Sequence, residues 1–141
     1  MDSLMLNNIN ITKLFRVNLE GGNVNHVLKK SEVDFNGFGE GYVSFIKFNH
    51  IKGWKKHNLM TMNLVVPLGK VKFVFYDSQK IVFKEVTIGE DNYCRLTVPP
   101  KIWFAFKGLS KEINLIINIS DIEHDPNEQE KLDLKLIKYN W

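Results

Sequence analysis

The sequence contains little cysteine and no long apolar run. Its single cysteine, Cys94, excludes an intrachain disulfide, and its strand-like surroundings predict a buried, inert thiol. No stretch approaches the roughly 18 to 20 apolar residues of a membrane helix, so we expect no membrane span. The first residues lack the basic segment and apolar stretch of a secretory signal. We therefore expect a cytoplasmic protein.

Short motifs that identify common enzyme classes are also missing. There is no Gly-x-x-x-x-Gly-Lys phosphate loop, no Gly-x-Ser-x-Gly elbow and no cysteine pair for zinc. The histidines His26, His50, His57 and His124 do not show the close spacing that places two metal ligands on one strand or helix. We expect no metal and no other cofactor.

Charge is nearly balanced overall but is uneven along the chain. The 19 Lys and Arg residues against 16 Asp and Glu give a formal net charge of +3, too small to predict a nucleic-acid partner. Basic residues gather between residues 52 and 72, namely Lys52, Lys55, Lys56, His57, Lys70 and Lys72. This patch suits a phosphate or another small anion, and the alternative is a set of lysines that only solvate one face.

Alternation of apolar and polar residues dominates the middle of the chain. It predicts strands over residues 41–48, 62–68, 70–76, 80–87, 95–98 and 113–119. Turn residues between them are typical of an antiparallel sandwich or barrel, and the length of 141 residues predicts one domain, 1–141. Within residues 1–35, the segments 9–11 and 13–17 could add edge strands. Because an unpaired edge recruits a partner chain, we expect a homodimer.

A helix is predicted only near the carboxyl end. Asp125 can cap it, Pro126 suits its first position and Glu128 completes a capping box. We expect a short, solvated C-terminal helix.

The order of several short tracts resembles the dTDP-4-dehydrorhamnose 3,5-epimerase family of cupins. The tracts are Ile51-Lys52-Gly53-Trp54-Lys55-Lys56-His57, Leu68-Gly69, Tyr76-Asp77, Leu96-Thr97-Val98-Pro99-Pro100, Phe106-Lys107-Gly108-Leu109-Ser110 and His124-Asp125-Pro126. The resemblance covers about residues 35 to 130. It implies an all-β cupin jelly-roll β-barrel, usually dimeric, that binds a nucleotide-linked 4-keto sugar and exchanges protons beside the ketone. The pathway implied is bacterial surface-polysaccharide synthesis.

Departures from the family fall on the residues that handle protons. The family's base histidine corresponds to Lys55, its second histidine to Phe104 and its acid tyrosine to Asn118, whereas Asp77 matches a family aspartate. By alternation Asp77 would face the barrel interior, and Lys55 is its natural cationic partner. Three functions remain open: an epimerase-type isomerase, a sugar 3,4-ketoisomerase, and a sugar-binding or nucleotide-sugar-binding cupin without catalysis.

The candidate catalytic residues are Lys55, His57 and Asp77. Lys55 could act as a base if its pKa is lowered, or as a cation that stabilises an enolate or holds a phosphate while His57 is the base. Candidate substrate-binding residues are Lys52, Trp54, Lys72, Arg95, Trp103 and Asn118. For the two tryptophans the alternative is packing as aromatic plugs of the barrel.

Overall fold

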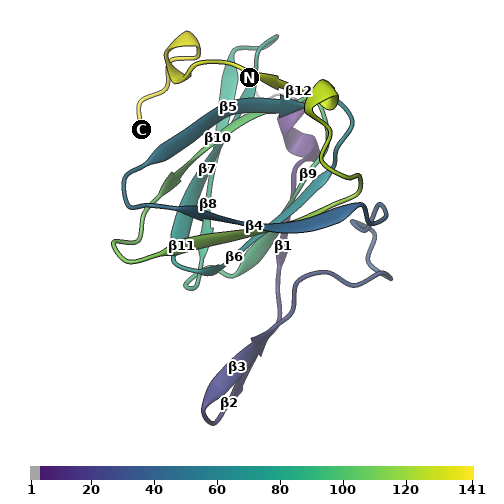
Figure 1. Ribbon diagram of the computed structural model, residues 1–141, viewed down its shortest axis with the longest axis vertical. Coiled ribbons are helices and arrows are strands. Elements are labelled where there is room, and N and C mark those ends of the chain that lie inside the picture. The colour runs from purple at the N-terminus through teal and green to yellow at the C-terminus, as the bar shows by residue number, and fades with distance from the viewer. Residues whose placement is uncertain (1–3) are drawn as a thin grey trace.

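Two five-stranded antiparallel sheets face each other in the computed structural model, which describes residues 4–141 (Figure 1). The first sheet has the strand order β1-β9-β6-β11-β4, and the second has the order β12-β5-β10-β7-β8. This architecture confirms the expected all-β cupin jelly-roll fold. Residues 1–3, on which the expected lack of a secretory signal partly rests, lie outside the described residues. No helix of residues 4–141 has the length and apolar character to span a membrane.

Each predicted strand of the middle of the chain is present within a few residues of its expected bounds, whereas the strands Gly22–Asn25, Ile51–His57, Trp103–Gly108 and Gln129–Lys131 were not predicted. The strand bounds are β1 Asn10–Lys13, β2 Arg16–Leu19, β3 Gly22–Asn25, β4 Glu40–Ile46, β5 Ile51–His57, β6 Met62–Leu68, β7 Lys70–Asp77, β8 Val82–Gly89, β9 Cys94–Val98, β10 Trp103–Gly108, β11 Asn114–Ser120 and β12 Gln129–Lys131. Short 3-10 turns lie at η1 Leu6–Asn8, η2 Pro126–Glu128 and η3 Leu134–Leu136.

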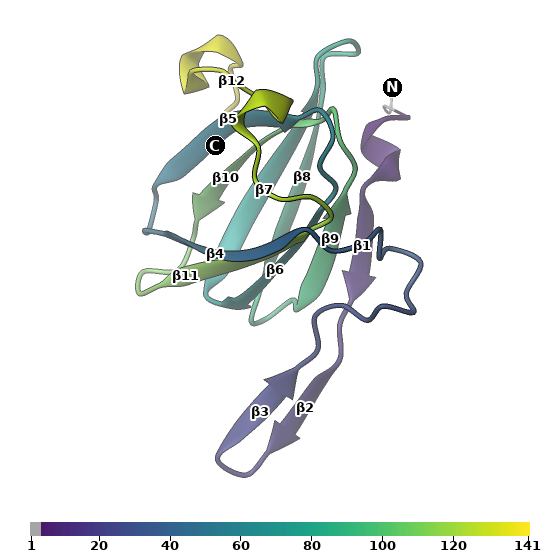
Figure 2. The same cartoon turned by 45° about the vertical axis from the view of Figure 1, so that its right-hand side comes forward.

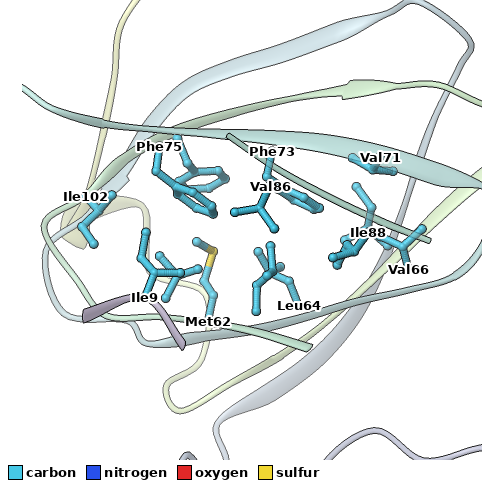
Figure 3. Packing of buried hydrophobic residues seen from close by; sticks show 14 of the residues in the cluster. Ile9, Met62, Leu64, Val66, Val71, Phe73, Phe75, Val86, Ile88 and Ile102 are labelled. Carbon is cyan, nitrogen blue, oxygen red and sulfur yellow. The ribbon is translucent and has the colours of Figure 1, made fainter. Parts of the chain in front are cut away.

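The main core fills the space between the sheets. Phe73 and Phe75 of β7 point toward Met62 and Leu64 of β6, as Figure 3 shows, and all four side chains are buried. Full burial of such a side chain stabilises the fold by about 1.5–3 kcal/mol. The core therefore holds the two sheets together on one side of the barrel.

A second apolar cluster covers the outer face of the second sheet. Trp54 and Trp103 belong to it, and the segment that follows β12 packs over them. The indole nitrogen Nε1 of Trp54 donates to the carbonyl oxygen of Ile137 at 3.1 Å, and the rings of Trp54 and Trp141 lie 6.2 Å apart. These contacts fix the C-terminal segment beside β5 (Figure 1).

The amino-terminal strands divide into an edge strand and a projecting hairpin. β1 pairs with β9 at the edge of the first sheet, as expected for residues 9–11. The expected edge strand at 13–17 is instead part of a hairpin, because β2 pairs with β3 in a separate two-stranded sheet, and this hairpin extends away from the barrel (Figure 2). Gly21, with a φ of 81°, permits the tight reversal between the two strands.

The expected C-terminal helix is only a single 3-10 turn, η2. Asp125 caps it as predicted, because its carboxylate accepts a hydrogen bond from the amide of Asn127 at 2.9 Å. The expectation of a solvated element is wrong for Glu128, whose side chain is buried. The chain cannot continue as a helix because Gln129 enters β12, which pairs with β5.

Candidate functional site

A cavity of about 560 Å³ lies inside the barrel, between the inner faces of the two sheets. Its lining comes from the first sheet (Tyr42, Ser44, Met62, Leu64, Ile116, Asn118), the second sheet (Lys52, Gly53, Trp54, Lys55, His57, Phe73, Phe104, Phe106) and the C-terminal segment (Lys131, Leu132, Asp133). Apolar and polar side chains contribute to this lining in equal number. Such a lining suits a site that binds an organic ligand and orients it through polar contacts.

Strand β5 presents two of the predicted catalytic residues to this cavity. Side chains alternate along the strand, so Lys55 and His57 face inward while Trp54 and Lys56 face outward. Gly53 is required at the start of this tract, because a Cβ atom there would lie 2.4 Å from that of Ala105 on β10. Its φ of 147° is also one that residues with side chains rarely adopt.

His57 forms a hydrogen bond with a carboxylate that was not among the site residues predicted from the sequence. Its Nδ1 lies 2.6 Å from Oε2 of Glu128, and both side chains are buried. The ring of His57 also stacks on Phe104, with centroids 5.9 Å apart. Burial lowers the pKa of His57, and the hydrogen bond and charge of Glu128 oppose this shift. A neutral imidazole that donates Nδ1–H to Glu128 keeps Nε2 as an acceptor toward the cavity.

Glu128 is fixed in turn by backbone amides. Its Oε1 accepts hydrogen bonds from the amides of Met60 at 2.9 Å and Leu59 at 3.4 Å. Burial alone would raise the pKa of Glu128, but the hydrogen bond from His57 and these two amides hold the pKa below its ordinary value. Glu128 is therefore an ionised carboxylate that orients His57 and stabilises its protonated form.

A phenol faces the cavity from the opposite sheet. Tyr42 of β4 lies directly across from Asn118 of β11, and Nδ2 of Asn118 donates to the Tyr42 hydroxyl oxygen at 2.8 Å. The amide of Asn118 is oriented because its Oδ1 accepts from the backbone N–H of Asn63 at 3.1 Å. Burial raises the pKa of Tyr42, and the Asn118 hydrogen bond opposes this. The hydroxyl is therefore protonated at neutral pH and can donate to a ligand.

Two further lysines stand at the margin of the cavity. Lys52 is exposed and its Nζ donates to the carbonyl oxygen of Phe45 at 3.3 Å, which links β5 to β4. Lys131 of β12 lies opposite Lys55 in the strand pairing. Together they add positive charge where an anionic ligand would enter.

Three of the predicted binding residues belong to the outer face of the second sheet. The indoles of Trp54 and Trp103 pack in the outer cluster, although Trp54 also borders the cavity. Lys72 lies 3.4 Å from Glu85 and beneath the C-terminal rings. The two indoles therefore pack as structural side chains, as in the alternative to substrate binding, but they lie outside the barrel under the C-terminal segment and do not plug it.

Asp77 and Arg95 also lie outside the cavity. Asp77 is buried at the end of β7, where Oδ1 accepts from the backbone amides of Gln79 and Lys80 at 2.9 and 3.3 Å. The predicted pairing with Lys55 is wrong, because β10 separates β5 from β7 and spaces their backbones by about 10 Å.

Arg95 belongs instead to a polar layer on the outer face of the first sheet. It is fully buried there, with NH2 at 2.8 Å from Glu32 and 3.4 Å from Asp34. The prediction that Arg95 reaches a diphosphate in the cavity is therefore wrong. Glu32 and Asp34 hold its guanidinium group on the outer face of the sheet, under the segment that carries these two carboxylates. Among residues 4–141 no group of three or more His, Cys, Asp and Glu side chains could hold a metal ion.

Tyr42 and Glu128 were not among the site residues predicted from the sequence. Tyr42 lies in a predicted strand, and its alternation with Ser44 and Ile46 was the available signal, yet only position 118 was considered for the family's phenol. Glu128 was assigned to a solvated helix. Neither site role could be predicted from the local sequence, because each depends on contacts between segments that lie far apart in the sequence.

Several solved protein structures are similar to this one over most of its length. The crystal structure of a dTDP sugar isomerase from Desulfovibrio desulfuricans G20 superposes with a TM-score of 0.90 and 33% identity, covering 95% of this chain and 90% of that one. No protein-family model matches the sequence, and no curated protein matches it.

More distant structures share the fold. QdtA, a sugar 3,4-ketoisomerase from Thermoanaerobacterium thermosaccharolyticum in complex with TDP, has a TM-score of 0.78 and 16% identity, with 94% of each chain covered. The dTDP-4-dehydrorhamnose 3,5-epimerase of Bacillus anthracis has a TM-score of 0.79 and 14% identity, covering 94% of this chain and 82% of that one. These agree with the resemblance drawn from the sequence. On the identity shared over nearly its whole length, the chain belongs to the family of the dTDP sugar isomerase.

Proposed function

We propose that the protein isomerises or epimerises a dTDP-linked 4-keto sugar by moving protons at carbons beside the ketone. The observation that carries this proposal is the buried pair of His57 and Glu128, which faces the Tyr42 hydroxyl across one cavity. A base and a phenolic acid on opposite walls are what enolisation of a bound ketone requires. The similarity to a dTDP sugar isomerase supports the substrate class.

His57 is the base in this proposal. Its Nε2 accepts the proton from the carbon beside the ketone, and the ionised Glu128 stabilises the imidazolium that forms. Because burial lowers the pKa of His57, the imidazole is neutral and ready at neutral pH. Glu128 is thus the partner of His57 in its predicted role as the base. Asp77 is not proposed to take part in the reaction.

Tyr42 is the acid in this proposal, and it faces the negative charge that develops on the enolate oxygen. Its hydroxyl accepts a hydrogen bond from Asn118 and donates its own proton to the thioether sulfur of Met60 at 3.8 Å, a weak acceptor that an enolate oxygen or carbon would replace. Asn118 is thus a positioning residue. The surrounding side chains of Leu64, Phe73 and Ile116 exclude water, which strengthens these electrostatic interactions.

Lys52 and Lys131 supply positive charge for the diphosphate. Both line the margin of the cavity, and their ammonium groups would remain in contact with solvent as the nucleotide binds. Trp54, Trp103, Lys72 and Arg95 are not included in the proposed binding site, because their side chains are engaged on the outer faces of the sheets. A cytoplasmic role in surface-polysaccharide synthesis stays a prediction.

We also propose that the protein is a homodimer. Val43 and Phe45 of β4 are more than half exposed, and they lie beside Ile117 and Leu115 of β11 on the outer face of the first sheet. This outer apolar patch, together with apolar residues on the projecting hairpin such as Leu19, suits a second copy of the chain.

The test of the reaction is deuterium exchange. The purified protein is incubated in D2O with dTDP-4-keto-6-deoxyglucose, and the mass of the sugar is followed. Mass gain that is lost in His57→Asn and reduced in Tyr42→Phe supports the proposal, and NMR of the product separates epimerisation from ketone migration. If the ligand binds without exchange, the protein is the non-catalytic binding cupin.

A further inference from the structure

Lys55 differs from the other lysines of β5 in its surroundings. Lys56 faces outward, with Nζ at 3.0 Å from Glu130, and Lys52 donates to a backbone carbonyl at the rim. Lys55 is half-buried in the cavity and forms no ion pair or side-chain hydrogen bond with any of residues 4–141. An inward-facing amine without a counterion is unusual, because burial penalises an ammonium ion that lacks a partner.

The charged groups around Lys55 favour its neutral form. Lys131 faces it from β12, and the carboxylate of Glu128 is already engaged by His57 and two backbone amides. Burial lowers the pKa of Lys55, Lys131 lowers it further, and the charge of Glu128 opposes the two. A neutral amine cannot stabilise an enolate by charge, but it is a nucleophile toward a carbonyl carbon.

We propose that Lys55 is a catalytic nucleophile that forms an imine with the ketone of the bound sugar. This inference rests on the proposed function, since it requires a keto sugar in the cavity. His57 lies on the same inner face of β5, and Tyr42 lies on the opposite wall. The amine, the base and the acid therefore surround one ligand.

The reaction balances without any oxidant or reductant. The Lys55 amine attacks the carbonyl carbon, so a C–N bond forms and the carbonyl oxygen takes a proton, with Tyr42 as the donor at hand. One of the two protons on the attacking nitrogen then passes to the carbinolamine hydroxyl, which leaves as water, and a protonated imine with one N–H remains. His57 removes a proton from the adjacent carbon, the C–H electron pair forms a C=C bond, and the π pair of the C=N bond moves onto nitrogen to give an enamine. Reprotonation and hydrolysis return the ketone and free Lys55.

The test is reductive trapping. The full-length protein is incubated with dTDP-4-keto-6-deoxyglucose and cyanoborohydride, which reduces imines, and the adduct is located by intact mass and peptide mapping. We expect one adduct on Lys55. The adduct should be lost in Lys55→Arg, which keeps the charge, and kept in Lys56→Arg, a matched change on the outer face. Turnover should fall in Lys55→Arg on the order of 100-fold.

Two results would overturn the imine while leaving the proposed function intact. One is deuterium exchange by the wild type without any trapped adduct. The other is turnover of Lys55→Arg within a few-fold of wild type, which would make Lys55 a cation that binds charge.

If the wild type shows no exchange, the substrate proposal fails, and pyridoxal 5′-phosphate then probes the amine directly. Preferential reduction onto Lys55 at neutral pH, with a midpoint moved to higher pH in Lys131→Met, would support the nucleophile. Equal labelling of Lys55 and Lys56 would contradict it.

Discussion

Nδ1 of His57 lies 2.6 Å from Oε2 of Glu128, although the two residues are 71 positions apart in the sequence. His57 ends β5, whereas Glu128 closes the turn η2 just before β12. Because β12 pairs with β5, the turn is folded back over the inner face of the strand on which His57 lies. The geometry of the proposed base therefore depends on the C-terminal segment.

Replacing Glu128 with Gln should lower kcat by roughly 100-fold with a much smaller change in KM, because general-base efficiency depends on stabilising the imidazolium. Steady-state kinetics would measure the effect. Glu130→Gln is the matched control, since Glu130 is half-exposed and pairs only with outward-facing groups such as Lys56. Equal losses in both variants would argue against a specific role for Glu128.

Tyr42→Phe should reduce turnover by about 10- to 100-fold, because it removes the acid while it keeps the ring. Tyr93→Phe is its control, since the Tyr93 hydroxyl donates to the His26 carbonyl oxygen at 2.9 Å and takes no part in the cavity. The control should lose only about 1 kcal/mol of stability. Normal turnover by Tyr42→Phe would mean that another group supplies the proton.

Stability should fall as the pH is lowered from about 6.5, the unfolded value for His. The folded pKa of His57 lies below its ordinary value, so the unfolded state takes up a proton first and is favoured in acid. The lowered pKa of Glu128 acts in the same direction below its ordinary value of 4.5. Thermal unfolding between pH 7 and 4 would measure the slope, and His57→Asn should reduce it. An unchanged slope in that variant would contradict the assignment.

Trp141→Ala should destabilise the protein by about 1–3 kcal/mol, because Trp141 packs on Trp54 and Tyr139 in the outer cluster. Chemical denaturation would measure the loss. Lys138→Ala, on the exposed side of the same segment, should have little effect. If both variants were as stable as wild type, the outer cluster would not anchor the segment.

Phe45→Glu should dissociate the proposed homodimer, since it places a charge in the outer apolar patch. Light scattering after size-exclusion chromatography would report the mass. The control is Val33→Glu, because Val33 is 92% exposed in a loop. A wild-type monomer would refute the dimer outright.

The fold could be predicted from the sequence because alternation is a local property. The segments 62–68 and 113–119 coincide with β6 and β11 almost residue for residue. Lys55 and His57 were selected from the family resemblance and the basic tract, because residues 51–57 were not among the strands predicted by alternation. Alternation does not identify which residues meet across the barrel, so the contact of Glu128 with His57 was not predicted.

The incorrect predictions for Trp54, Trp103 and Asp77 also arise because alternation is a local property. Period-two reasoning tells which residues share a face, but it does not say which face is interior when both are apolar. Trp54 and Trp103 were predicted as substrate-binding residues, yet the C-terminal segment covers them from outside. Likewise, Asp77 shares the inner face of β7, but its position along the strand directs it to the backbone of the next turn.

Strand β5 carries chemistry on one side and structural packing on the other, which restricts how this tract can change in length. Gly53 lies beside Ala105, the pairing with β10 shifts register between Ala105 and Phe104, and from Trp54 onward successive side chains alternate between the outer cluster and the cavity. Insertion of one residue between Trp54 and Lys55 would turn Lys55 and His57 outward. Substitutions in this strand can therefore alter the reaction, but insertions or deletions would remove the site and the attachment of the C-terminal segment at the same time.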